Sequence, residues 1–231
     1  MKQENIKAVV FDLDGTLIRS TIDFKKMKKN IIEALVSHGV ERDVFSDNWK
    51  TTSIIVSGEK FLRKIGLPED SISIILDKIS DIMNQVELEK VSKTKQIHGA
   101  VKTLLALRKR GLRIGVLTRG CREYALEALK VVDMLELIDI LLARDDTDKP
   151  KPNPYQLLKT IETLQVKGEE TIMVGDSSLD ALCAKNAGIK FIGVLTGIAN
   201  EEEFRKIDSS TWSIIVLPDI TGIPTLLDSI N

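Results

Sequence analysis

Residues 7–17 read Lys-Ala-Val-Val-Phe-Asp-Leu-Asp-Gly-Thr-Leu, and this stretch decides how the rest of the chain is interpreted. Its first part, residues 7–11, is a short apolar run with β-branched valines, which predicts a buried strand. Its second part contains two carboxylates, Asp12 and Asp14, followed by Gly15, which predicts a turn. The sequence therefore predicts a buried strand with two acidic side chains at its carboxyl end.

Apolar runs of the same kind recur along the chain and alternate with helical patterns. Further strands are predicted at residues 113–117, 171–174, 190–194 and 213–216, with a weaker one at 138–142. Helices are predicted between them at residues 98–110, 122–131, 154–164 and 179–187. Strands that alternate with helices indicate an α/β fold, in which a mostly parallel, Rossmann-like sheet has helices on both faces.

One region, residues 20–91, breaks the alternation because it shows helical patterns and little strand. Its first helix has apolar residues at helix spacing between Phe24 and Leu35, and Gly39 ends it. Further helices are predicted near residues 43–51, 57–65 and 69–91. We therefore expect a small helical cap domain at residues 20–91, inserted into a core domain of residues 1–19 and 92–231.

Composition limits the classes of function. The 231 residues are 43% apolar and 29% charged, as in ordinary globular proteins. The net charge of −1 gives no general field for nucleic acid or an anionic membrane. No stretch approaches the roughly 18 apolar residues of a membrane span. Two cysteines form neither a disulfide framework nor a metal motif, so we expect a cytoplasmic protein that acts on a small molecule.

Polar residues follow several of the predicted strands. In open α/β sheets, ligands bind beyond the carboxyl ends of the strands, so these residues should meet at one edge. Three clustered carboxylates repel one another and need a cation, and Mg²⁺ prefers such hard oxygen ligands. A carboxylate can act as a nucleophile, while a hydroxyl, backbone N–H groups and a lysine hold phosphoryl oxygens. The set favours phosphoryl transfer, and it consists of Asp12, Asp14, Thr118, Arg119, Lys149 or Lys151, Asp176 and Asp180.

These residues resemble, in order and context, the four motifs of the haloacid-dehalogenase superfamily in its capped, phosphoglycolate-phosphatase-like branch. The first motif is the segment from Asp12 to Leu17, and the second is Thr118 at a strand end. The third is a lysine in a Lys-Pro-x-Pro setting, and the fourth is Gly175-Asp176-Ser177 with Asp180. Arg19-Ser20 departs from the Asp-Ser that many capped relatives carry after the first motif, which weakens assignment to any one subfamily.

The resemblance implies a role for each matching residue. Asp12 is the nucleophile and a Mg²⁺ ligand. Asp14 is the general acid and then the base that activates water, and its backbone carbonyl faces the metal. Thr118 and the N–H of Arg119 hold the phosphoryl group, and the metal site is completed by Asp176 and Asp180.

The phosphate-binding lysine is not fixed by the pattern, because Lys149 and Lys151 each open a Lys-Pro-x-Pro or similar phrase. The longer phrase, Lys149-Pro150-Lys151-Pro152-Asn153-Pro154, favours Lys149. Lys151 stays the alternative.

The leading hypothesis is a Mg²⁺-dependent phosphatase that hydrolyses a small phosphorylated metabolite through an aspartyl phosphate. The first alternative is a phosphomutase of the same fold, which would require a sugar bisphosphate. The second is a binding module that has lost turnover. The identity of the substrate and the oligomeric state stay open.

Overall fold

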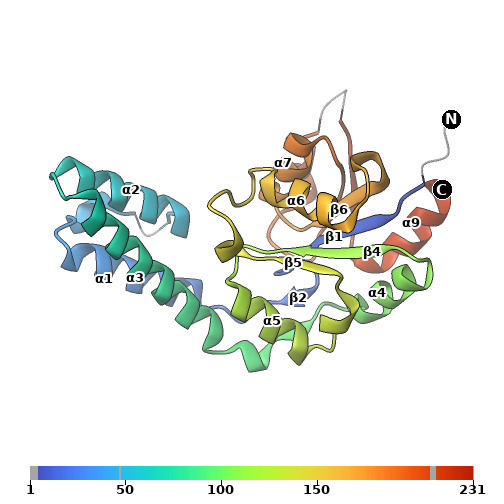
Figure 1. The fold of residues 1–231 in the computed structure, drawn as a ribbon, viewed down its shortest axis with the longest axis horizontal. Coiled ribbons are helices and arrows are strands. Elements are labelled where there is room, and N and C mark those ends of the chain that lie inside the picture. Colours follow the sequence, from blue (N-terminus) through green and yellow to red (C-terminus); the bar gives the residue numbers. More distant parts are fainter. Residues whose placement is uncertain (1–4, 47, 209–211, 231) are drawn as a thin grey trace. The chain divides into compact units, whose positions relative to one another are not determined.

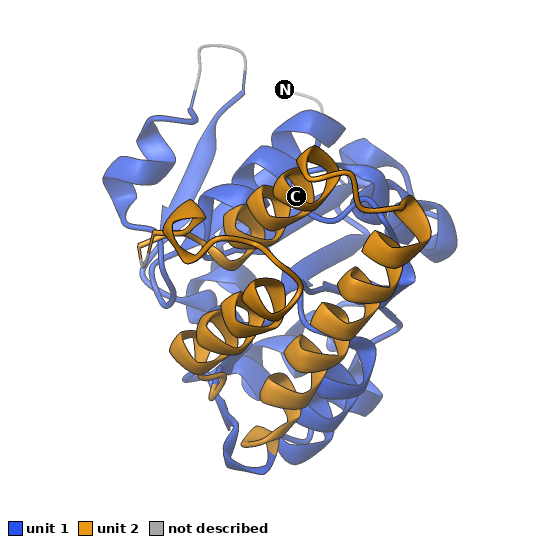
Figure 2. Cartoon of the chain, turned by 90° about the vertical axis from the view of Figure 1, so that its left-hand side faces the viewer, with its two compact units in different colours: residues 1–20, 92–231 blue, residues 21–91 orange. Residues whose placement is uncertain are grey.

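The computed structural model describes residues 5–46, 48–208 and 212–230. The chain forms two compact units, a core unit of residues 1–20 and 92–231 and a helical unit of residues 21–91. Figure 2 colours the two units separately. The first boundary between them lies one residue beyond the predicted domain limit at residue 19.

The core unit is built on a parallel sheet of six strands in the order β5-β4-β1-β6-β7-β8. β1 lies in the middle of the sheet, and all five of its residues are buried, as expected for a strand covered on both faces. The predicted α/β class is confirmed. The strands are β1 (Ala8–Asp12), β4 (Arg113–Leu117), β5 (Ile140–Leu142), β6 (Thr171–Gly175), β7 (Lys190–Val194) and β8 (Ile214–Leu217).

Helices cover both faces of this sheet, with α6 and α7 on one side and α4 and α5 on the other (Figure 1). Helices α8 and α9 near the carboxyl end were not predicted from the sequence. The α-helices of the core unit are α4 (Ala100–Lys109), α5 (Arg122–Val131), α6 (Tyr155–Leu164), α7 (Ser178–Ala187), α8 (Glu201–Arg205) and α9 (Ile223–Ile230). Short 3-10 helices are η3 (Leu135–Leu137), η4 (Arg144–Asp146), η5 (Gly168–Glu170) and η6 (Ile220–Gly222).

A two-stranded antiparallel ribbon, β2 (Ile18–Arg19) with β3 (Lys95–Gln96), was also not predicted. The chain leaves the core unit just after β2 and returns to it just before β3. The N–H of Ile97 donates to the carbonyl of Leu17 at 2.8 Å, which extends the pairing. Two-residue strands are too short to give a periodic pattern. The pairing of the two segments that connect the core unit to the helical unit is therefore visible only in the structure.

The helical unit consists of α1 (Phe24–Ser37), α2 (Thr51–Lys64) and α3 (Glu69–Leu88), with 3-10 helices η1 (Arg42–Val44) and η2 (Val91–Lys93), the latter at the boundary between the units. It has its own apolar core, in which α1 contributes Met27, Ile31 and Leu35. The sequence predicted helices at 43–51 and 57–65, and this was wrong. The structure has η1 and one continuous α2, and residue 47 of the predicted helix lies outside the described residues.

The predicted break fell at residues 52–56, Thr-Ser-Ile-Ile-Val, where serine and β-branched side chains lower the helix propensity. Gly58, inside the predicted helix at 57–65, costs about a further 1 kcal/mol relative to alanine. In the structure Gly58 is buried within α2 and faces Leu35 of α1, where an added Cβ would lie 2.6 Å from Leu35 Cδ1. The close packing of α2 against α1 outweighs the low helix propensity of glycine.

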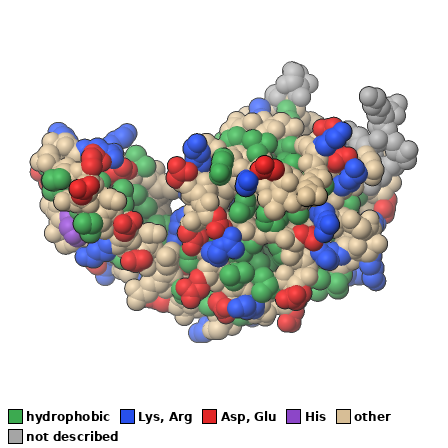
Figure 3. All heavy atoms as spheres, viewed as in Figure 1, with side chains coloured by type: hydrophobic (Ala, Val, Ile, Leu, Met, Phe, Trp, Pro, Cys, Tyr) green, Lys and Arg blue, Asp and Glu red, His purple; other side chains and the backbone are tan. Residues whose placement is uncertain are grey.

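Acidic and basic side chains are interspersed over the visible surface of each unit (Figure 3). This mixture agrees with the net charge of −1. Within the described part of the chain, every helix is too short or too polar to cross a bilayer.

Candidate active site

The register of the central strands brings the predicted site residues to one edge of the sheet. Asp12 pairs with Leu117 of β4, and Phe11 pairs with Val174 of β6. Thr118 therefore lies one residue beyond the level of Asp12, and Asp176 lies one residue beyond it on the other side. Parallel strands place these carboxyl ends together.

Three carboxylates form the centre of the site. Asp12, Asp176 and Asp180 each offer an oxygen, and these oxygens all lie within 4.8 Å of one another. The three residues are 7%, 3% and 1% exposed. Asp180 is fixed by the start of α7, because Ser177 donates to its Oδ2 from the backbone N–H at 3.1 Å and from Oγ at 2.5 Å. This is a capping box, which orients the acidic side chain toward the strand ends.

Two glycines let the backbone approach Asp176 closely. A Cβ added at Gly197 would lie 1.7 Å from Asp176 Oδ2, and one at Gly15 would lie 2.5 Å from the same oxygen. Gly15 also has φ +92°, which favours glycine. The N–H of Ile198 donates to Asp176 Oδ2 at 2.9 Å, and Thr16 Oγ1 donates to Oδ1 at 3.3 Å. The Asp176 carboxylate thus accepts a hydrogen bond at each of its two oxygens.

The lysine in the site is Lys151, not the favoured Lys149. Lys151 Nζ donates to Asp12 Oδ1 at 2.5 Å, to Asp180 Oδ1 at 2.7 Å and to the carbonyl of Leu117 at 3.1 Å. Its side chain is 2% exposed. Lys149 is exposed, and its Nζ lies 5.7 Å from the ring centre of Tyr155. Motif spacing cannot separate two lysines in one proline-rich loop, because the path of the loop decides which one turns inward.

The charges in the cluster do not balance. Burial raises the pKa of Asp12 well above its ordinary value although Lys151 opposes the shift, and Asp180 and Asp176 raise it further. Burial and Asp180 also raise the pKa of Asp176. Burial alone would lower the pKa of Lys151, but Asp12 and Asp180 raise it above its ordinary value. Three carboxylates facing one ammonium group fit a hard divalent cation, since oxygen donors and surplus negative charge are what Mg²⁺ requires.

Asp14 lies outside the cluster formed by Asp12, Asp176 and Asp180. Its half-buried side chain accepts a hydrogen bond at Oδ1 from the hydroxyl of Tyr124 at 2.6 Å. Thr118 is 1% exposed, and its Oγ1 accepts from the N–H of Gly120 at 3.0 Å. Arg119 is half-buried, and burial lowers the pKa of its guanidinium despite the nearby Asp180.

Sequence reasoning missed Tyr124, and it named Ser177 only as part of the fourth motif, without its contact to Asp180. Ser177 was readable, because a serine three residues before an acidic residue at a helix start predicts a capping box. Tyr124 gave no signal beyond an aromatic residue on the apolar face of a predicted helix. Its contact with Asp14 joins residues 110 positions apart.

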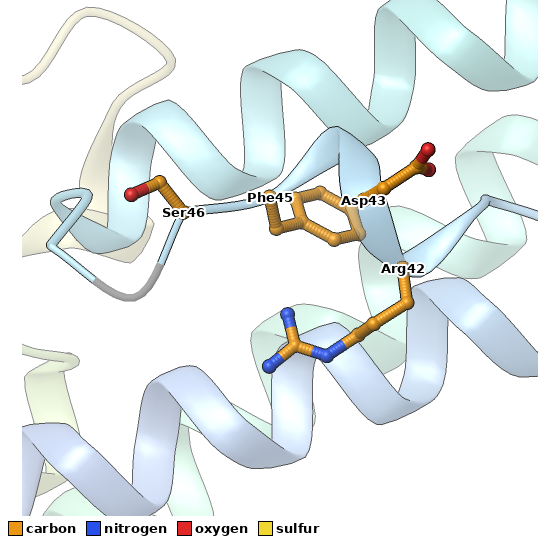
Figure 4. A pocket seen from close by; sticks show the side chains of 4 residues that line it. All are labelled: Arg42, Asp43, Phe45 and Ser46. Carbon is orange, nitrogen blue, oxygen red and sulfur yellow. The ribbon is translucent and has the colours of Figure 1, made fainter.

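A hollow on the surface of the helical unit is lined by Arg42, Asp43, Phe45 and Ser46. Figure 4 shows the side chains of Arg42 and Asp43 pointing in different directions beside the ring of Phe45. None of these residues was predicted as a site residue from the sequence.

Comparisons with known proteins agree with this geometry. The family model described as haloacid dehalogenase-like hydrolase matches residues 9–194. The chain is 30% identical to pyrophosphatase PpaX of Halalkalibacterium halodurans, covering 94% of this chain and 96% of that protein. It is 28% identical to phosphoglycolate phosphatase of Vibrio parahaemolyticus, covering 87% and 89%. The crystal structure of a hydrolase from Pseudomonas syringae matches the fold with a TM-score of 0.67 and 21% identity, covering 97% and 99%.

Proposed function

The chain belongs to the haloacid dehalogenase-like hydrolase family, and similar proteins are named pyrophosphatase and phosphoglycolate phosphatase. We propose that it hydrolyses a small phosphate monoester with Mg²⁺, through a phosphoryl intermediate on Asp12. One observation carries the proposal. Asp12, Asp176 and Asp180 are buried together around the ammonium group of Lys151, at the carboxyl ends of β1 and β6.

The reaction has two steps, and Asp12 is at the centre of both. In the first, a carboxylate oxygen of Asp12 attacks phosphorus, the bond to the leaving oxygen breaks, and Asp14 gives that oxygen a proton. In the second, water attacks the same phosphorus while Asp14 accepts a proton from the water. Inorganic phosphate leaves, and both carboxyl groups return to their starting states.

The neighbouring residues hold charge in place during these steps. Thr118 Oγ1, the N–H of Arg119 and Lys151 Nζ would hold phosphoryl oxygens, because all three can donate hydrogen bonds. Asp12, Asp176, Asp180 and the backbone carbonyl of Asp14 would hold Mg²⁺. The bound ion supplies positive charge that screens the anionic nucleophile from the anionic phosphoryl group.

A second candidate substrate is pyrophosphate, in which the leaving group is itself a phosphate. The observation that favours it is the 30% identity, over 94% of this chain, to a protein named pyrophosphatase. The same residues would act in the same two steps. Comparison of kcat/KM for pyrophosphate and phosphoglycolate would rank the candidates.

The proposal is tested by replacing Asp12 with Asn and measuring phosphate release from an aryl phosphate with Mg²⁺ present. We expect the rate to fall on the order of 10⁴-fold or more, as for other enzymes that lose a nucleophile. Asp228→Asn is the matched control, because Asp228 lies on α9 in an ion pair with Arg110, which follows α4; this change should leave the rate unchanged. Acid-quenched enzyme should carry one phosphoryl group on Asp12 by mass spectrometry.

Two results would contradict this account. Robust turnover by the Asp12→Asn variant would exclude the covalent mechanism. Transfer of phosphate between positions of a sugar, dependent on an added bisphosphate and without phosphate release, would instead indicate a mutase.

A further inference from the structure

We propose that Tyr124 is a positioning residue for the acid–base carboxyl group of Asp14, a role that rests on the function proposed above. The phenol oxygen donates its hydrogen to Asp14 Oδ1 at 2.6 Å. Tyr124 is fully buried in the first turn of α5, whereas the Asp14 side chain is half-buried. A buried phenol needs a polar partner, and here that partner is the carboxyl group two residues beyond the nucleophile.

The loop that follows β4 fixes the ring of Tyr124. A Cβ added at Gly120 would lie 2.7 Å from Tyr124 Cδ1, so the ring occupies the space that a larger residue there would fill. The N–H of Tyr124 donates to Cys121 Sγ at 3.5 Å, which caps the helix start. The segment that supplies Thr118 to the phosphate site therefore also holds the phenol in place.

The direction of the hydrogen bond between Ser20 and Tyr124 follows from the bond that Tyr124 makes to Asp14. Ser20 Oγ lies 3.4 Å from the phenol oxygen. Because the phenol has one hydrogen and gives it to Asp14, Ser20 is the donor in that second contact. The resulting order is Ser20 to Tyr124 to Asp14. Ser20 is also the last residue of the core unit before the chain enters the helical unit.

The contact constrains the geometry of proton transfer. The bond from the phenol to Oδ1 restrains the rotation of the Asp14 carboxyl group, and we assign proton transfer to Oδ2. A protonated carboxyl group still accepts through its carbonyl oxygen, more weakly than a carboxylate does, so the contact can persist in both steps. Tyr124 keeps its own proton throughout, while the proton that moves passes between Asp14 Oδ2 and the leaving oxygen or water. Small errors in the placement of such a group cost large factors in rate.

The test compares substrates that differ in their need for an acid. An alkyl phosphate such as phosphoglycolate needs a proton on its leaving oxygen, whereas dinitrophenyl phosphate has a leaving group that departs as an anion. In Tyr124→Phe we expect kcat/KM for the alkyl ester to fall roughly 10- to 100-fold, a part of the 10²- to 10⁴-fold that general acids supply. For the dinitrophenyl ester we expect a change below about threefold. We use kcat/KM because it reports the steps from free enzyme up to the departure of the leaving group and excludes hydrolysis of the phosphoryl intermediate.

Tyr155→Phe is the matched control, because Tyr155 is the other tyrosine of the chain and is 47% exposed. It should leave both substrates unaffected. Equal losses for the two esters in Tyr124→Phe, or no loss for either, would overturn the positioning role. Thermal unfolding of the variant separates a general loss of structure from the selective effect. If the unaltered enzyme released no phosphate, or Asp12→Asn stayed active, the proposed function itself would fail, and this role with it.

Discussion

At the residue scale, one ammonium group organises the site. Lys151 Nζ contacts Asp12 and Asp180, and all three side chains are nearly free of solvent. Charges removed from water are costly unless each has a partner, so the removal of one member leaves the others uncompensated. The lysine therefore opposes the rise in the pKa of Asp12 that burial causes, and it contacts two carboxylates at once.

We predict that Lys151→Met lowers kcat/KM for an aryl phosphate about 10²- to 10³-fold, the usual effect of losing one stabilising donor. Lys149→Met is the matched control, since it makes the same change two residues away at an exposed side chain. It should change kcat/KM less than about threefold. Steady-state kinetics with Mg²⁺ present measure both values of kcat/KM. A larger loss in Lys149→Met than in Lys151→Met would refute the assignment of Lys151.

At the element scale, Asp139 ties the edge strand β5 to the rest of the sheet. Its Oδ2 accepts from the N–H of Ile114 in β4 at 2.7 Å and from Arg108 at 3.2 Å. Arg113 donates to its Oδ1 at 3.2 Å. Burial opposes ionisation, yet these donors hold the pKa of Asp139 below its ordinary value. A three-residue strand with few pairs of its own gains from such an anchor.

We predict that Asp139→Asn lowers the free energy of unfolding by about 1–2 kcal/mol at pH 7, because hydrogen bonds to a charged acceptor are lost. The folded-state pKa is lowered, so this stabilisation is fully present above the ordinary aspartate pKa of about 3.9. It disappears as the pH falls below that value through the folded-state pKa. Denaturant unfolding across this range measures it. A difference between variant and parent that is the same at pH 7 and well below pH 3.9 would contradict the prediction.

At the scale of the whole molecule, each unit has an apolar core of its own. One cluster of the core unit includes Leu157, Phe191 and Phe204. The cluster of the helical unit includes Leu35, Ile54 and Leu62. The carboxylate cluster lies wholly within the core unit, so its charge imbalance affects the stability of that unit directly.

We predict that Mg²⁺ raises the Tm of the core unit and that a chelator reverses the effect. Saturation at 100 times Kd would contribute about 2.7 kcal/mol if the ion binds only the folded state. The shift should shrink as the pH falls, because burial raises the pKa of Asp12 and Asp176 and protons then compete with the metal. Differential scanning fluorimetry measures it. Asp176→Asn should lose the shift and Asp228→Asn should keep it; an equal shift in both would refute the metal site.

The sequence by itself determined the fold class and which polar residues stand at the carboxyl ends of the strands. Apolar runs of five residues predict buried strands, and polar residues directly after them predict where ligands bind. The sequence could place Asp12, Thr118 and Asp176 together because they lie at the carboxyl ends of parallel strands. These ends lie side by side whatever path the loops take. These are local patterns with a fixed geometric consequence.

The tertiary structure alone decided which lysine enters the site and what holds Asp14. Lys151 meets Asp12 across 139 positions of sequence, and Tyr124 meets Asp14 across 110. Periodicity fixes which face of an element a side chain occupies, but it does not fix the path of a loop or the partner across a packed interface. The same limit hid the continuity of α2, because Ile54, in the predicted gap at residues 52–56, is buried in an apolar core shared with other helices.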